Sequence, residues 1–254
     1  MTTLVHLIPA AEEGWHVLLD LAELDSDSWL LVGGQMMFLL AAEHAVSMPR
    51  PTADMDVVVD VRARPRGTEW LAAWLIEQRF VLDGTSPDGI GHRFVREAAH
   101  GLGSVQFDVL GPEGVGSRAK LLTLPPARTV QAPGSAQAFH RSSLVPVTVI
   151  GTSGNQPRSG RVRRPDVLGA LVAKAAATQI PARQNPQRDW QDAALLLSLL
   201  DDPIAAADTL TKKDRQRLRL LEPLFDRDHR GWAVFEDDSA HRRGTATLGF
   251  LLDR

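Results

Sequence analysis

The sequence predicts an α+β protein in which a mixed sheet with flanking helices is followed by a C-terminal helical domain. Three observations indicate this order. Short β-branched runs alternate with helical periodicity over residues 1–110. The tract 124–164 is rich in Pro, Gly and Ser, which is typical of turns and loops. From Pro165 onward, helical periodicity dominates. We therefore expect two domains, residues 1–160 and residues 161–254.

The individual elements follow from the apolar period, which is 3.6 residues in a helix and 2 in a strand. In the first part we expect helices at Glu12–Leu24, Gln35–Ala45 and Thr68–Gln78, and strands at Trp29–Val32, Asp54–Val61, His92–Arg96 and Val105–Leu110. Later we expect short strands at Arg128–Gln131 and Leu144–Ile150, a mobile loop at Gly151–Gly160, helices at Pro165–Thr178 and Gln187–Leu200, and one or two further helices. Pro165 is expected in the first turn of its helix, where its missing N–H is tolerated.

Composition limits the possible classes of protein. No apolar run reaches the roughly 18–20 residues that span a bilayer, and Met1-Thr2-Thr3 lacks the basic region of a signal peptide. The chain has no cysteine, which excludes disulfides and thiolate metal sites. The histidines show no metal-ligand spacing, so we expect no zinc. We expect a cytoplasmic protein without membrane contact.

Charge is unevenly distributed along the chain. Residues 1–110 carry 16 acidic and 7 basic side chains, a net of −9, whereas residues 111–200 carry 4 acidic and 11 basic, a net of +7. Such a basic segment suits polyphosphate or nucleic acid, although a solvated surface is the alternative. The cluster Arg158, Arg161, Arg163 and Arg164 is a candidate for an RNA backbone, as is the group Lys212, Lys213, Arg215, Arg217 and Arg219.

The most informative stretch runs from Trp29 to Asp60. A glycine pair, Gly33-Gly34, follows an apolar strand and precedes a helix, so the backbone can approach phosphate oxygens at the positive end of the helix dipole. Arg50 and Thr52 lie in the next loop and are candidates for phosphate contact, although loops are commonly polar.

Three aspartates are candidate metal ligands. Asp54 and Asp56 open a β-branched strand at i and i+2, so they share one face, about 6.6 Å apart along the chain. The pairs Asp25–Asp27 and Asp226–Asp228 have the same spacing but no following strand, and we expect them in loops or at helix ends. Asp108, inside a predicted strand, is expected beside the first pair, where three carboxylates would hold two metal ions. An edge strand with Asp108 facing water is the alternative.

In the later helices, Lys174 lies in an otherwise apolar turn and either compensates triphosphate charge or extends to solvent. Asp189 and Asp192 share a helix face. We expect Asp189 to be a first-turn residue that stabilises the helix dipole, and Asp192 to pair with Lys174.

The order of these motifs resembles the AbiEii/AbiGii-type nucleotidyltransferase toxins, which include the MenT toxins and belong to the DNA polymerase β superfamily. The resemblance rests on Gly33-Gly34, the segment Arg50–Asp56, Lys174 and the Arg188–Asp192 segment, and it covers residues 29–200. Gln35 stands where many relatives have Ser or Thr, and its amide can also donate to phosphate. Arg188 replaces the usual lysine.

The resemblance implies a nucleotidyltransferase fold and the transfer of a nucleoside monophosphate from an NTP to an acceptor hydroxyl. Asp54, Asp56 and Asp108 would be catalytic and bind Mg²⁺ or Mn²⁺, with Lys174 and Asp192 completing the catalytic set. Gly33, Gly34, Gln35, Arg50, Thr52 and Lys174 would bind the nucleotide. The implied acceptor is the tRNA 3′ end, and the implied role is the toxin of a toxin–antitoxin pair with a cognate antitoxin protein. A small-molecule, aminoglycoside-type nucleotidyltransferase and a non-catalytic nucleotide-binding relic are the alternatives.

Overall fold

The computed structural model describes residues 2–4, 7–48, 52–98, 101, 103–116, 119, 121–151, 156–180, 187–235 and 238–253. The chain is a mixed α/β protein that divides into two compact units. The first unit comprises residues 1–132 and 142–164, and the second comprises 133–141 and 165–254. The helical unit thus takes a short segment from the middle of the chain. The expected boundary at residue 160 falls inside a strand of the first unit.

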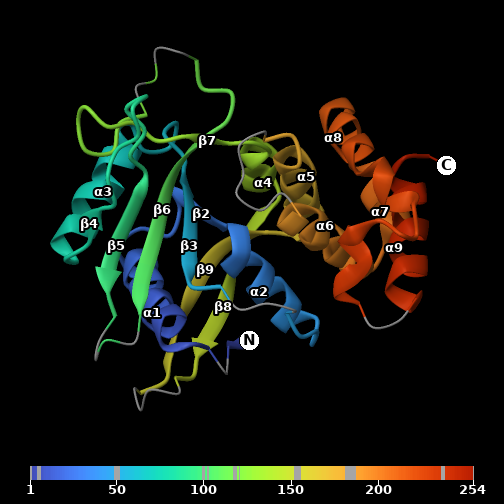
Figure 1. Ribbon diagram of the computed structural model, residues 1–254, viewed down its shortest axis with the longest axis horizontal. Helices are drawn as coiled ribbons and strands as arrows, with labels where there is room; N and C mark the ends of the chain where they lie inside the picture. The colour runs from blue at the N-terminus through green and yellow to red at the C-terminus, as the bar shows by residue number, and fades with distance from the viewer. Residues whose placement is uncertain are drawn as a thin grey trace. The chain divides into compact units, whose positions relative to one another are not determined.

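Within the described residues, the main sheet of the first unit has six strands of mixed direction. Its central order is β2-β3-β6-β5-β4, with β7 paired to the end of β6 (Figure 1). β3 lies antiparallel to β2 and parallel to β6, and β5 and β4 continue antiparallel. The strands are β2 (Trp29–Val32), β3 (Asp54–Val59), β4 (Val81–Leu82), β5 (Arg93–Glu97), β6 (Ser104–Pro112) and β7 (Gln131–Ala132).

One face of this sheet carries the core. Met55, Val105 and Phe107 are fully buried, and Gly14 of α1 (Pro9–Leu24) lies directly against Met55 and Val105. Since side chains alternate along a strand, the aspartates at positions 54, 56 and 108 point to the opposite face. Helices α2 (Gly33–Glu43) and α3 (Gly67–Glu77) complete the packing of this unit.

A smaller sheet in the first unit has the order β1-β8-β9. Its strands are β1 (Thr2–Leu4), β8 (Ser142–Val149) and β9 (Arg158–Pro165). β9 corrects the expected loop at Gly151–Gly160, because residues 158–160 are already strand; residues 152–155 lie outside the described part. Pro165 is also not in a helix. It ends β9, and Asp166 caps the next helix by accepting from the Gly169 N–H at 2.7 Å.

The second unit is helical. α4 packs on α5, and α5 packs on α6, which also contacts α9. Gly134 allows the first of these contacts, since its φ is +80° and a Cβ there would lie 2.4 Å from Ala173 Cα. The described helices are α4 (Ser135–His140), α5 (Val167–Ala177), α6 (Gln187–Leu199), α7 (Pro203–Asp208), α8 (Lys212–Leu218) and α9 (Asp238–Leu251), with 3₁₀ turns at Arg219–Phe225 and Arg230–Val234. This is more than the one or two expected after α6.

None of the helices described is both long and apolar enough to cross a membrane.

Candidate functional site

Three aspartates lie on one face of the main sheet, and we call Asp54, Asp56 and Asp108 the acidic row. Asp56 on β3 is the direct partner of Asp108 on the parallel strand β6. Their backbones are therefore about 4.8 Å apart, the ordinary spacing of neighbouring strands. Asp54 lies two residues before Asp56 and pairs with Gln106. The spacing in the sequence predicted that Asp54 and Asp56 share a face. The pairing of β3 with β6 places the backbone of Asp108 beside that of Asp56.

The glycine pair lies against this row. α2 begins at Gly33, whose φ is +66°, and no side chain caps the helix start. A Cβ on Gly33 would lie 1.8 Å from Asp56 Oδ2, and one on Gly34 would lie 2.9 Å from Thr52 Cγ2. Only glycine fits at position 33, because both the left-handed backbone and the carboxylate exclude a side chain. The N-terminal N–H groups of α2 thus begin beside Asp56.

Gln35 is part of the core. Its side chain is 1% exposed, with Nε2 donating to the Thr52 carbonyl at 2.7 Å and Oε1 accepting from Trp15 Nε1 at 2.7 Å. The amide therefore ties α2 to the loop before β3, with both its nitrogen and its oxygen bonded within the protein. Arg50, an expected phosphate contact in that loop, lies outside the described residues.

Asp108 has a partner that the sequence did not indicate. Arg93 on β5 lies directly opposite it and donates from Nε to Oδ1 and from Nη2 to Oδ2, both at 3.1 Å. The Gln106 amide lies beside both groups, and with its oxygen turned towards the guanidinium it accepts from Arg93 Nε at 3.0 Å. Asp108 is buried, and thus does not face water as the edge-strand alternative required. Arg93 had no motif to mark it, because its position opposite Asp108 depends on strand register.

Arg93 lies in the electrostatic field of two members of the row, Asp108 and Asp54. Its hydrogen bond to Asp108 is the main cause of a raised pKa of the guanidinium; burial opposes this, and the charges of Asp108 and Asp54 add to it. The neighbouring His92 has a lowered pKa, chiefly because it is partly buried. A positive charge therefore stays on Arg93 at any physiological pH.

The expected centre of three carboxylates is not formed by the side chains. Among the described residues, no group of three or more His, Cys, Asp or Glu side chains is arranged to hold a metal ion. Asp108 does not fit as a ligand while both of its oxygens bind Arg93. Asp54 and Asp56 share one face of β3, and carboxylate oxygens are the donors that a hard divalent cation prefers, so this pair fits such an ion by its chemistry.

A second cluster lies in the helical unit. Lys174 of α5 contacts Asp192 Oδ2 at 2.6 Å and Asp189 Oδ1 at 3.3 Å, both on α6. All three side chains are buried, with exposed fractions of 10% for the lysine and 4% or less for the aspartates. The predicted Lys174–Asp192 pair is confirmed. The alternative in which Lys174 extends to solvent is not seen. Asp189 lies in the first turn of α6, as expected, and it is in addition a buried partner of the lysine.

Three of the four arginines of the β9 cluster form ion pairs, and the fourth, Arg161, is exposed. Arg158 pairs with Asp20 at 2.7 Å, Arg163 pairs with Asp27 at 2.7 Å, and Arg164 pairs with Glu43. These arginines fasten β9 to neighbouring segments of the same unit, which gives them a role in the fold that the sequence did not indicate. In the second basic group, Arg215 pairs with Asp253 at 2.8 Å, and Arg217 donates to Gln137.

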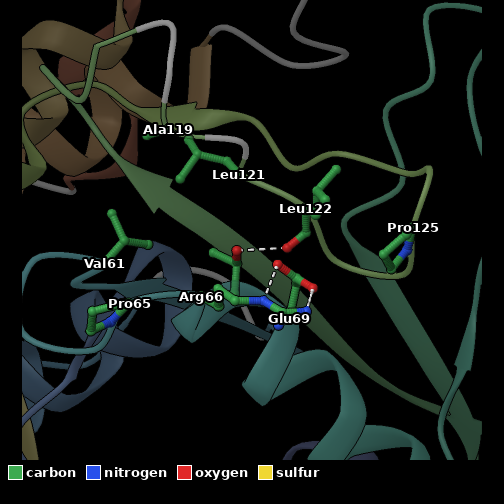
Figure 2. Close-up of a pocket in the computed structure, with 9 residues that line it drawn as sticks. Val61, Pro65, Arg66, Glu69, Ala119, Leu121, Leu122 and Pro125 are labelled. Carbon is green, nitrogen blue, oxygen red and sulfur yellow. Dashed lines mark hydrogen bonds and ion pairs between the residues drawn. The ribbon is translucent and has the colours of Figure 1, made fainter.

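A separate pocket of about 560 Å³ lies beside the start of α3 (Figure 2). Thr68 Oγ1 donates to the Leu122 carbonyl at 2.6 Å, and Arg66 pairs with Glu69. Val61, which follows the end of β3, lines this pocket, whereas Asp54 begins the strand. The acidic row does not contribute to it. The lining residues are Val61, Pro65, Arg66, Thr68, Glu69, Ala119, Leu121, Leu122 and Pro125.

No protein-family model matches this chain, and a comparison with curated proteins finds no similar sequence.

Proposed function

We propose that this protein is a metal-dependent nucleotidyltransferase that moves a nucleoside monophosphate from an NTP to an acceptor hydroxyl. The observation that carries the proposal is the contact between Gly33 and Asp56. It joins an uncapped helix start, which attracts phosphate, to a carboxylate pair suited to a divalent cation. A nucleoside triphosphate bound to Mg²⁺ needs both partners within a few ångströms.

The order of the elements supports a nucleotidyltransferase fold. A strand, the glycine pair, a helix and the strand with Asp54 and Asp56 follow one another, and β6 with Asp108 lies beside that strand. This is the order that the resemblance to the AbiEii/AbiGii-type family implies. The alternative of an incidental Asp-x-Asp is disfavoured, because Asp226 and Asp228, with the same spacing, are exposed and lie outside any strand.

Each residue of the site has a role in this reaction. Asp54 and Asp56 would hold Mg²⁺ or Mn²⁺, and the N–H groups at the start of α2 would bind phosphate oxygens. The metal supplies positive charge that offsets the charge of the phosphate groups. The acceptor hydroxyl loses its proton to solvent as its oxygen forms a bond to the α-phosphorus. The bond from that phosphorus to the bridging oxygen breaks, and pyrophosphate leaves with the electron pair of that bond. Positioning and electrostatic stabilisation are the main contributions of the protein.

The acceptor is proposed from the resemblance, which implies the tRNA 3′ end and a toxin neutralised by a cognate antitoxin. It also gives Lys174 and Asp192 a part in the reaction. Three of the β9 arginines already pair with carboxylates of their own unit, so the tRNA acceptor is supported by the resemblance and not by this strand.

Transfer of label tests the proposal. The purified protein is incubated with each α-labelled NTP, Mg²⁺, and either total tRNA or an aminoglycoside panel. We expect label on tRNA from the wild type, loss of at least about a thousandfold in Asp56→Asn, and full activity in Asp228→Asn, the matched control from an exposed Asp-x-Asp pair. Label on an aminoglycoside would make the acceptor a small molecule. Absence of label with every acceptor and NTP would contradict the proposal.

A further inference from the structure

The pair formed by Arg93 and Asp108 places a cation where the proposed function needs a free carboxylate. Two parallel N–H···O bonds occupy both oxygens of Asp108, and the Gln106 amide, with its oxygen turned towards the guanidinium, accepts from the same group. This fork geometry is the strongest that arginine makes with a carboxylate. A metal ion and Arg93 therefore compete for the same two oxygens.

The two partners differ in exposure. The Asp108 side chain is 10% exposed, whereas that of Arg93 is 43% exposed. Arg93 thus reaches a buried carboxylate from the rim of the sheet, and its guanidinium is within reach of a ligand that arrives at the acidic row. Two oxygens of a phosphate group match the guanidinium fork, as the two oxygens of a carboxylate do.

The pairing of three strands aligns Arg93 with two of the aspartates. Arg93, Asp108 and Asp56 are successive partners across β5, β6 and β3, so they form one line on one face of the sheet. A triphosphate bound at the start of α2 beside Asp56 would bring negative charge to this line. Arg93 could then exchange its partner with little movement of the backbone.

We propose that Arg93 is a positioning residue that holds Asp108 in the nucleotide-free protein, and that it passes to the phosphate groups of a bound NTP and so releases Asp108 to the metal. The inference depends on the proposed function, because it assigns the ligand of Arg93 to the same triphosphate.

The test measures metal affinity without turnover. Mn²⁺ binding to the full-length, nucleotide-free protein is followed by electron paramagnetic resonance in four proteins: wild type, Arg93→Gln, Asp108→Asn and the double variant. Asp108→Asn alone should change the affinity little, because Asp108 is already engaged. Arg93→Gln should raise the affinity about tenfold, and most of this gain should disappear in the double variant. An equal gain with and without Asp108 would overturn the inference.

Two further variants keep the test decisive. Arg96→Gln is the matched control, since this arginine of the same strand pairs with Glu13 at 2.6 Å and lies outside the line; its Mn²⁺ affinity should equal that of the wild type. Arg93→Lys keeps the charge but cannot form the fork, so it tests the inference if Arg93→Gln does not fold. We expect its Mn²⁺ affinity to lie between those of the wild type and Arg93→Gln, and an affinity equal to that of the wild type would count against the fork.

Failure of the inference and failure of the proposed function are distinguishable. If the four proteins show the expected coupling but no acceptor is labelled, the Arg93–Asp108 competition stands and the reaction is wrong. If label is transferred but the coupling is absent, the reaction stands and Arg93 only supports the fold. A non-hydrolysable NTP should also make the affinity for Mn²⁺ sensitive to Asp108→Asn in the wild-type background, and insensitivity would contradict the exchange of partners.

Discussion

Gly33 and Asp56 constrain each other at the scale of single residues. The glycine has a left-handed backbone, and a methyl group on it would overlap the Asp56 carboxylate. Strain from the backbone alone is about 1–2 kcal/mol for alanine in this region. The overlap with Asp56 would destabilise the folded protein further, and it would displace the carboxylate of the proposed metal site.

Gly33→Ala should therefore destabilise the protein by more than the backbone strain and abolish nucleotidyl transfer. Gly84→Ala is the matched control, because Gly84 has a φ of +73° but nothing within 4 Å of the added methyl group. We expect this control to lose about 1 kcal/mol in urea unfolding and to keep its activity. Equal activity in the two variants would show that contact with Asp56 is unimportant.

Asp25 gives a prediction that depends on pH. Partial burial raises its pKa, but hydrogen bonds from Ser28, the Asp27 N–H and Arg64 outweigh this and lower the pKa to about 2. The folded protein thus binds this proton less tightly than the unfolded chain, whose aspartate has a pKa of about 3.9. The ionised carboxylate stabilises the fold at neutral pH, and this contribution is lost as the pH falls from about 4 towards 2.

Asp25→Asn should lower the free energy of unfolding by about 1 kcal/mol at pH 7, since solvent screens part of the interaction. The difference from the wild type should shrink steadily between pH 4 and pH 2 in urea titrations. A difference that stays constant over this range would mean that the charge of Asp25 does not contribute.

At the scale of elements, α5 and α6 are joined by the buried contacts of Lys174 with Asp189 and Asp192. Removing one partner of a buried ion pair costs about 3–5 kcal/mol, because a charge remains in a poorly solvated place. Lys174→Met should have a cost of this size and should abolish transfer. Lys212→Met, an exposed lysine in the first turn of α8, is the control and should have little effect on either. A Lys174→Met protein as stable as the wild type would contradict the buried cluster.

The sequence correctly predicted the strands whose own residues have a strand pattern. β3 follows from its β-branched run Val57–Val59, and β2 was predicted with the observed bounds Trp29–Val32. β9 was missed, because its arginines and glycine have no strand pattern. Its partners are Asp20, Asp27 and Glu43, which are distant in sequence and become neighbours only in the folded unit.

The residues of the candidate site were also predictable only where local spacing determines their position. The spacing of Asp54 and Asp56 places them on one face whatever the rest of the fold is. The position of Arg93 opposite Asp108, by contrast, depends on how β5 and β6 are paired. Likewise, Asp189 could be placed on a helix face from the sequence, but its burial depends on the packing of α6 on α5.

On the scale of the whole molecule, the charge asymmetry of the sequence disappears. The first unit contains 17 acidic and 14 basic side chains, a net of −3, and the second contains 14 of each. The reason is that β9 belongs to the first unit, where its arginines pair with acidic residues of the N-terminal part. The linear pattern suggested a basic segment beside an acidic half, but the folded units are each close to neutral. Net charge therefore does not favour nucleic acid as the acceptor, and it does not oppose it.

The central claim is that Asp54, Asp56 and the start of α2 form one site for a metal-bound triphosphate. The most direct measurement is a crystal structure with Mn²⁺ and a non-hydrolysable NTP analogue, recorded with anomalous scattering. We expect Mn²⁺ about 2.1 Å from oxygens of Asp54 and Asp56, and phosphate oxygens at the N–H groups that follow Gly33. Mn²⁺ or triphosphate bound elsewhere, with Asp54 and Asp56 unliganded, would contradict the claim.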